Sequence, residues 1–198
     1  MANDDDDGQR WAKELVKRVG KAIKDVRGTK SAAWLSDRTA ELGFRVSPTV
    51  IAKLDSGHRG SVLSVPELIV LAAALNTSPV NLVYPGPYES PVEILPNREN
   101  GELSAAEWFS GVYSYLGHDG VGAPEDPAEQ WQANTETLRQ WRYLDELFIT
   151  KEQMDDPKHI AVLDRQIKAT CDRLGIKLPP DEVFGRDTIE LKTGDDDA

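Results

Sequence analysis

Apolar residues between positions 10 and 84 recur at steps of three and four, which is the repeat of an amphipathic helix. Gly28, Gly43, Gly57 and Asn76 interrupt this pattern and divide it into five segments. The first segment has the apolar stripe Trp11, Leu15, Val19, Ala22, Ile23 and Val26. The pattern therefore predicts five helices, spanning about residues 10–27, 31–42, 48–56, 64–75 and 78–83.

Three of these segments begin with a serine followed closely by a proline. Ser47-Pro48 and Ser78-Pro79 each place an N-cap residue before a first helical position that needs no backbone N–H. Ser64 and Glu67 have the spacing of a capping box, and the apolar run that follows them predicts a central, largely buried helix. These caps strengthen the assignment of helices 48–56, 64–75 and 78–83.

The segment 48–56 has two different flanks. Ile51 and Leu54 fall on one side of a helix, whereas Thr49, Ala52 and Lys53 fall on the other. A short helix with an apolar back and a small, polar, cationic front suits insertion into a DNA groove.

The second half of the chain has a different organisation. Proline and glycine dominate residues 84–96, where 92–95 fit either a short strand or an extended segment, and a short helix is expected near 104–115. Trp108, Phe109, Tyr113 and Tyr115 could line a ligand pocket, but their helical spacing favours core packing.

Two long helices are predicted at 127–154 and 157–174, with Gly175 in a Schellman ending. Their expected seam contains Trp131, Leu138, Trp141, Leu144, Phe148, Ile160, Leu163, Ile167 and Leu174.

We therefore expect an all-α protein in five parts. These parts are a disordered acidic arm (1–9), a helical DNA-binding domain (10–87), a linker with one short helix (88–124), a helical hairpin (125–180) and an acidic tail (181–198).

The distribution of charge separates the second part from the others. The whole chain has a net charge of −11, but residues 10–87 carry twelve Lys and Arg against six Asp and Glu. Screening limits electrostatic attraction to about 8 Å at physiological salt, so the local charge decides whether phosphate is attracted.

Five features occur together in this part of the chain: the basic first helix, Leu35-Ser36, the segment Ser47–Gly57, the capped helix Leu63–Leu75 and the segment Ser78–Val83. Together they resemble the lambda-repressor-like domain of the XRE/Cro family of helix-turn-helix transcription regulators. The resemblance covers residues 10–87 and implies a five-helix domain that binds double-stranded DNA. Two features depart from the family. The connection between Leu35 and Ser47 is longer than usual, and Ala32 stands where the family often has a phosphate-anchoring Gln.

The resemblance also implies a set of contacts. Bases in the major groove would be read by Pro48, Thr49, Ala52 and Lys53. Phosphates would be contacted by Lys30, Ser31, Arg45, Ser47, His58 and Arg59. Because the base-reading set has no Arg, Asn or Gln, part of the specificity would come from DNA shape.

The sequence offers no pattern typical of an enzyme, a cofactor site or a metal site. The three histidines lie in separate segments without metal-ligand spacing to Cys171, which we expect to be a buried apolar residue. No apolar run is long enough to span a membrane and no secretory signal is visible, so a cytoplasmic, nucleoid-associated protein is expected.

We therefore expect a sequence-specific regulator, most simply a bacterial or phage repressor, with phage immunity and chromosomal roles equally compatible. The hairpin would form a homodimer, since symmetric dimers double the DNA site. The alternative is a protein-interaction module, such as an antitoxin-like partner or a scaffold, whose C-terminal helices bind another protein.

Overall fold

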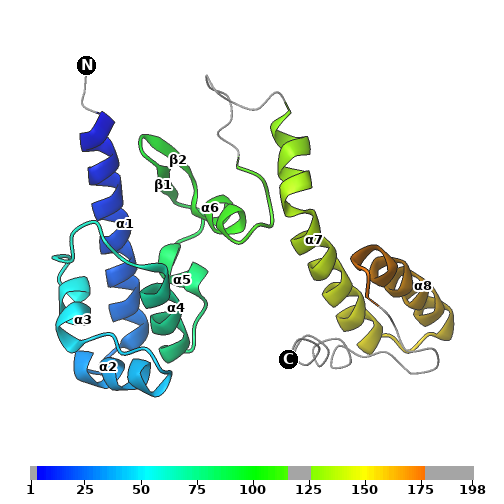
Figure 1. The fold of residues 1–198 in the computed structure, drawn as a ribbon, viewed down its shortest axis with the longest axis horizontal. Helices are drawn as coiled ribbons and strands as arrows, with labels where there is room; N and C mark the ends of the chain where they lie inside the picture. Colours follow the sequence, from blue (N-terminus) through cyan, green and yellow to red (C-terminus); the bar gives the residue numbers. More distant parts are fainter. Residues whose placement is uncertain (1–3, 116–125, 177–198) are drawn as a thin grey trace, which may run out of the picture. The chain divides into compact units, whose positions relative to one another are not determined.

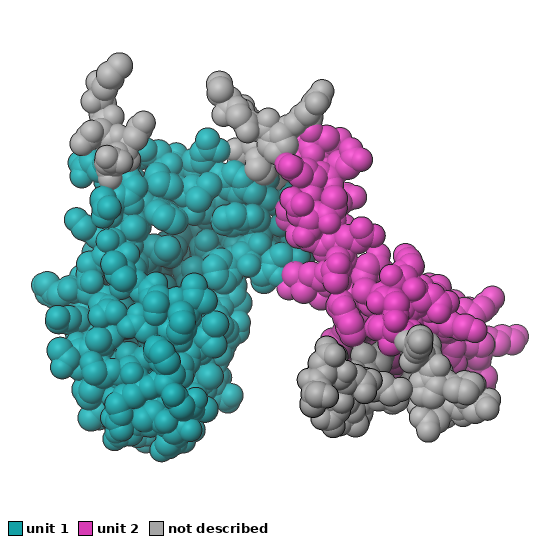
Figure 2. All heavy atoms as spheres, in the orientation of Figure 1, with its two compact units in different colours: residues 1–117 teal, residues 118–198 magenta. Residues whose placement is uncertain are grey.

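The computed structural model describes residues 4–115 and 126–176 (Figure 1). These ranges contain eight α-helices and one two-stranded sheet, so the described chain is mostly helical. It divides into two compact units, Met1–Gly117 and His118–Ala198, which are coloured separately in Figure 2. The predicted acidic tail 181–198 lies outside the described residues, as do positions 1–3 and 116–125.

The five helices predicted for the first unit are all present. They are α1 (Asp4–Arg27), α2 (Ala32–Glu41), α3 (Pro48–Asp55), α4 (Val65–Ala74) and α5 (Pro79–Val83). The predicted caps are also confirmed, because the hydroxyls of Ser47, Ser64 and Ser78 each accept a hydrogen bond from a backbone N–H of the first turn. Glu67 completes the capping box by accepting from the backbone N–H of Ser64.

The core of this unit lies where the five helices meet. Its fully buried side chains include Ile23, Leu35, Ile51, Leu54, Leu71 and Leu82. Helix α4 contributes Val70, Leu71, Ala72 and Ala74 to this core, as its apolar run predicts, but Val65 and Ile69 are 68% and 54% exposed. The other helices cover only one face of α4, which is the face that carries Leu71.

The predicted disordered arm 1–9 is wrong for residues 4–9, since α1 begins at Asp4. Aspartates in a first helical turn are stabilised by the unpaired N–H groups and by the positive end of the helix dipole. Val26, which belongs to the predicted apolar stripe, is 48% exposed. Leu42 is 51% exposed, because α2 ends at Glu41 and Leu42 forms its C-cap.

The segment after α5 is folded and belongs to the first unit. Strands β1 (Pro91–Leu95) and β2 (Arg98–Gly101) pair antiparallel, with Val92 opposite Asn100 and an irregularity between Glu93 and Leu95. Helix α6 (Glu102–Phe109) follows directly. Val92, Ile94 and Ala105 are buried in the same core as α1–α5. The short helix expected near 104–115 is present as α6, and of the two alternatives for 92–95 the strand is found. The expectation that residues 91–109 only link two parts is wrong, because they pack into the core of the first unit.

The aromatic residues of this segment pack in pairs. The rings of Tyr84 and Phe109 meet edge to face at 5.9 Å, and those of Trp108 and Tyr115 are 5.3 Å apart. Helix α6 ends earlier than predicted, at Phe109, and the chain turns at Gly111 with a positive φ of 71°. As a result Phe109, Val112 and Tyr113 are 48%, 45% and 59% exposed.

The second unit contains α7 (Pro127–Glu152) and α8 (Pro157–Leu174), as predicted. Gly175 has a φ of 71°, and Ile176 N–H donates to the Cys171 carbonyl, which confirms the Schellman ending. The buried residues of this hairpin are Leu144, Leu147, Phe148, Ile167 and Cys171.

Part of the predicted hairpin seam is wrong. Leu138 and Trp141 are 46% and 38% exposed. At about 100° per residue, Leu138 lies about 120° around α7 from Leu144. Helix α8 packs on the flank that carries Leu144 and leaves the flank with Leu138 uncovered by any described residue of this unit.

Candidate nucleic-acid interface

Helix α3 has a buried flank and an exposed flank, as its sequence predicts. Ile51 and Leu54 are 0% and 1% exposed and belong to the core. All four residues predicted to read bases are exposed, namely Pro48, Thr49, Ala52 and Lys53. The arrangement leaves the small, polar and cationic flank open to a ligand.

The end of α3 is held against α1 at very short range. A Cβ atom built on Gly20 would lie 2.3 Å from the carbonyl oxygen of Leu54, so only glycine permits this approach. About two turns further along α1, Arg27 donates through both terminal nitrogens to the Asp55 carboxylate, at 3.2 and 2.7 Å. These contacts fix α3 to the longest helix of the first unit.

The connection that leads into α3 is fixed by Thr39. Its hydroxyl donates to the Ser36 carbonyl at 2.8 Å and accepts from the Val46 N–H at 3.0 Å. Both Ser36 and Thr39 are fully buried. The longer connection between Leu35 and Ser47 is thus held by a buried hydrogen-bonded turn.

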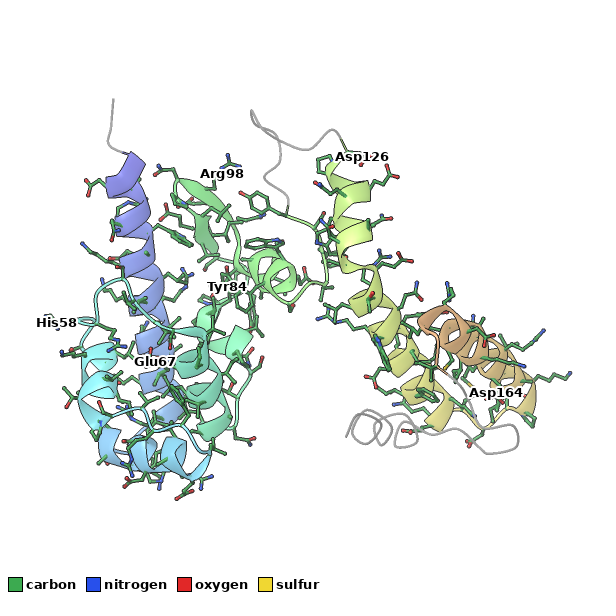
Figure 3. All side chains as sticks on the ribbon, in the orientation of Figure 1. His58, Glu67, Tyr84, Arg98, Asp126 and Asp164 are labelled. Atoms are coloured by element: carbon green, nitrogen blue, oxygen red, sulfur yellow. The ribbon has the colours of Figure 1, made fainter. Side chains whose placement is uncertain are left out.

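The residues predicted to contact phosphate fall into two groups. Lys30, Ser31, Ser47 and His58 are exposed. The hydroxyls of Ser31 and Ser47 cap α2 and α3, and the Lys30 ammonium lies 5.9 Å from the centroid of the Trp34 ring. Figure 3 shows His58 on the loop that follows α3.

The two arginines of the predicted set are engaged within the molecule. Arg59 donates to Glu67 at 2.8 Å and to the Val62 carbonyl at 3.2 Å. Arg45 forms an exposed ion pair with Asp37 at 3.1 Å. Sequence reasoning missed these partners, because no local repeat connects residues eight positions apart across a loop.

The remaining arginines of residues 10–87 also have internal partners. Arg18 donates to the Val83 carbonyl at 2.9 Å and lies over the Tyr84 ring, and burial lowers the pKa of its guanidinium. Arg38 pairs with Glu41.

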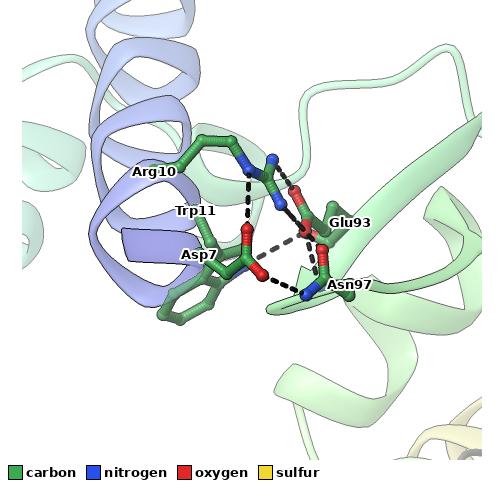
Figure 4. A network of polar contacts seen from close by, with 5 residues as sticks. All are labelled: Asp7, Arg10, Trp11, Glu93 and Asn97. Atoms are coloured by element: carbon green, nitrogen blue, oxygen red, sulfur yellow. Dashed lines mark hydrogen bonds and ion pairs between the residues drawn. The ribbon is translucent and has the colours of Figure 1, made fainter. Parts of the chain in front are cut away.

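A network of polar contacts binds the first turns of α1 to the β-hairpin (Figure 4). Arg10 donates to both carboxylate oxygens of Glu93, at 2.8 and 2.6 Å, and Asn97 donates from its side chain to Asp7 at 2.9 Å. The hydrogen bonds from Arg10, and after them the one from the Asn97 N–H, lower the pKa of Glu93. Trp11 donates to the Glu93 carbonyl at 3.3 Å. The network is structural and holds the acidic end of α1 in place.

The lysines of the first unit are, by contrast, on the surface. Lys13, Lys17, Lys21 and Lys24 are all exposed along α1, and none of them belongs to the predicted set of contacts. Their spacing of four, four and three residues was the signal that could have identified them as one row.

Within residues 4–115 and 126–176, no group of three or more His, Cys, Asp or Glu side chains is placed to hold a metal ion. No helix in those ranges has the length and apolar character needed to cross a membrane. No protein-family model, no curated protein and no solved structure matches the chain.

Proposed function

We propose that this protein binds double-stranded DNA sequence-specifically through α3 and regulates transcription, most simply as a repressor. The observation that carries the proposal is the exposure of Thr49, Ala52 and Lys53 on a helix whose opposite flank is fully buried. A helix about 10–12 Å across fits the major groove, which is about 12 Å wide. Bound at an operator, the protein would block the polymerase.

Each exposed residue of α3 supports a different kind of contact. The Lys53 ammonium can donate to guanine O6 and N7, and the Thr49 hydroxyl can bond to a base edge. Ala52 and Pro48 offer apolar surface to a thymine methyl group. Lys30 precedes α3 in the sequence and His58 follows it. Both would contact phosphates and so fix the position of the protein along the duplex.

A binding experiment with the full chain tests this proposal. The protein is incubated with a random-sequence duplex library, and the bound fraction is recovered over several rounds at several salt concentrations. A DNA-binding regulator enriches a defined sequence. The T49A/K53A double variant should lose about 2–6 kcal/mol of discrimination between that sequence and its mismatched forms, at about 1–3 kcal/mol for each base contact. The control is K158A/K168A on α8, which should leave discrimination unchanged.

Two results would contradict the proposal. One is recovery of no preferred sequence at any salt concentration. The other is unchanged discrimination by T49A/K53A, which would show that another surface reads the bases.

We also propose that the second unit forms a homodimer through α7. Leu138 and Trp141 are 46% and 38% exposed, and Leu138 lies about 120° around α7 from the buried Leu144. Complete burial of an exposed apolar side chain contributes about 1.5–3 kcal/mol, and covering the part of these two that is still exposed contributes a fraction of that, which favours association. A dimer would place two copies of α3 on one symmetric site.

Sedimentation of the full chain tests the dimer. L138E should shift the protein toward monomer, because it adds a charge to the uncovered flank. The control Q132E adds the same charge on the other side of α7 and should leave the assembly unchanged. A monomeric wild-type chain that also binds no DNA would instead favour the interaction-module alternative, in which this flank of α7 docks a different protein.

A further inference from the structure

We propose that the four exposed lysines of α1 form a second phosphate-binding surface, which contacts the DNA backbone beside the segment that follows α3. We call this surface the lysine row and define it as Lys13, Lys17, Lys21 and Lys24. The inference rests on the proposed DNA-binding function and adds to it a surface that contributes affinity without reading sequence.

The geometry of α1 aligns the four side chains. At 100° per residue their positions fall within about 80° of one another around the helix, and they span about 16 Å along it. That length corresponds to about five base pairs of duplex, since each strand carries one phosphate per 3.4 Å. All four side chains are exposed.

The lysine row adjoins the end of α3. A Cβ built on Gly57 would lie 3.5 Å from Cγ of Lys17, so the chain leaving α3 passes directly over the Lys17 stem. Further along this segment, Ser61 donates to the Gln9 side chain at 3.4 Å. Residues 57–61 therefore follow the flank of α1 that runs from Lys17 back to Gln9. His58, labelled in Figure 3, lies in this segment and is exposed.

The arginines and the lysines of residues 10–87 differ in their contacts within the molecule, and this difference supports the assignment. Every arginine of residues 10–87 bonds to a carboxylate or a backbone carbonyl. Arg18, Arg27 and Arg59 are held in buried or partly buried contacts, whereas Arg38 and Arg45 form exposed pairs with Glu41 and Asp37. The cations open to an external anion are therefore the exposed lysines together with these two arginines. Lys17 does contact Glu14 at 3.4 Å, but both side chains are about 60% exposed and such a pair stabilises by no more than about 1 kcal/mol. A phosphate can displace that carboxylate.

The test compares two double variants of the full chain on the sequence enriched by the wild type. The first is K17Q/K21Q in the lysine row, and the control is K158Q/K168Q on α8, which removes the same charge. Each lost phosphate contact lowers the magnitude of the log-affinity against log-salt slope by about 0.9. The row variant should therefore lose about 1.8 from the slope and bind about 30-fold more weakly at 0.15 M salt. The ratio of affinities for matched and mismatched DNA should stay the same.

The outcomes separate the two proposals. If the wild type enriches a sequence and K17Q/K21Q keeps the wild-type slope, the lysine row is wrong while the α3 assignment stands. A changed matched-to-mismatched ratio would also contradict the lysine-row proposal. If the wild type binds no DNA, both proposals fall. Should K17Q/K21Q fold poorly, K13Q/K24Q provides the same measurement on the two ends of the row.

Discussion

The guanidinium of Arg27 and the carboxylate of Asp55 form a two-pronged ion pair between the last turn of α1 and the last residue of α3. Both side chains are largely buried, with 6% and 17% of their surface exposed. Arg27 also donates to the Lys30 carbonyl at 2.8 Å, so one guanidinium fixes the turn after α1 as well as the position of α3. The orientation of the proposed reading helix thus depends on a pair 28 residues apart.

Removing one member of this pair should destabilise the first unit strongly. In Arg27→Met the Asp55 carboxylate stays largely buried without its partner, and such losses amount to about 3–5 kcal/mol. Urea unfolding followed by far-UV circular dichroism measures the change. The matched control is Arg38→Met, which removes an exposed pair with Glu41 and should change stability by less than about 1 kcal/mol. Equal effects of the two variants would contradict a structural role for the buried pair.

Gly20 and Gly8 both lie within α1 but should respond oppositely to alanine. Gly20→Ala places a methyl group 2.3 Å from the Leu54 carbonyl oxygen, so α3 must move away and its buried residues lose packing. We expect a loss of about 1–3 kcal/mol and weaker DNA binding. Gly8→Ala meets no atom within 4 Å and should stabilise the helix by up to about 1 kcal/mol. Thermal unfolding of the two variants side by side checks this, and a stabilised Gly20→Ala would disprove the close approach.

These contacts show which parts of the structure the sequence could predict. The caps at Ser47, Ser64 and Ser78 and the two flanks of α3 depend on residues three or four positions apart, and all of them are found in the structure. Local signals of this kind need no knowledge of the fold.

The features that the sequence did not reveal depend on distant partners. Residues 92–95 fitted either a strand or an extended segment because the run is short. What makes them a strand is their pairing with β2 and the entry of Val92 and Ile94 into the core of the first unit. The arginine partners lie up to 83 residues away, as for Arg10 and Glu93, and no periodicity encodes them. Arg59 was predicted to contact phosphate, yet its pairing with Glu67 became visible only once the chain was folded.

The network at Glu93 should make the stability of the first unit sensitive to acid. Because the folded state lowers the pKa of Glu93 below its ordinary value of 4.5, the unfolded chain binds a proton more readily. This contribution is present above pH 4.5 and is lost as the pH falls through the lower, folded pKa. The unfolding free energy of the wild type should therefore decrease in this range, and Glu93→Gln should show a shallower decrease. The control Glu99→Gln, on the neighbouring strand and exposed, should retain the wild-type slope.

Cys171 should report on the packing of α7 against α8. It is fully buried, and burial, together with the nearby Asp172 charge, raises the pKa of its thiol, so little thiolate is present near pH 8. A thiol reagent such as 5,5′-dithiobis(2-nitrobenzoic acid) should react slowly with the native chain and rapidly in denaturant, releasing one chromophore per chain because the sequence has one cysteine.

The labelling rate should depend on the core that surrounds the thiol. Leu144→Ala removes a buried neighbour from the same cluster and should destabilise the hairpin by about 2–5 kcal/mol, so transient opening and labelling accelerate. Leu138→Ala, on the uncovered flank of α7, should leave the labelling rate unchanged in the monomer. If the wild-type chain reacts more slowly as its concentration is raised, this flank is buried when the chain associates. A native thiol that reacts as fast as the denatured one would show that α8 does not pack on α7 through Cys171.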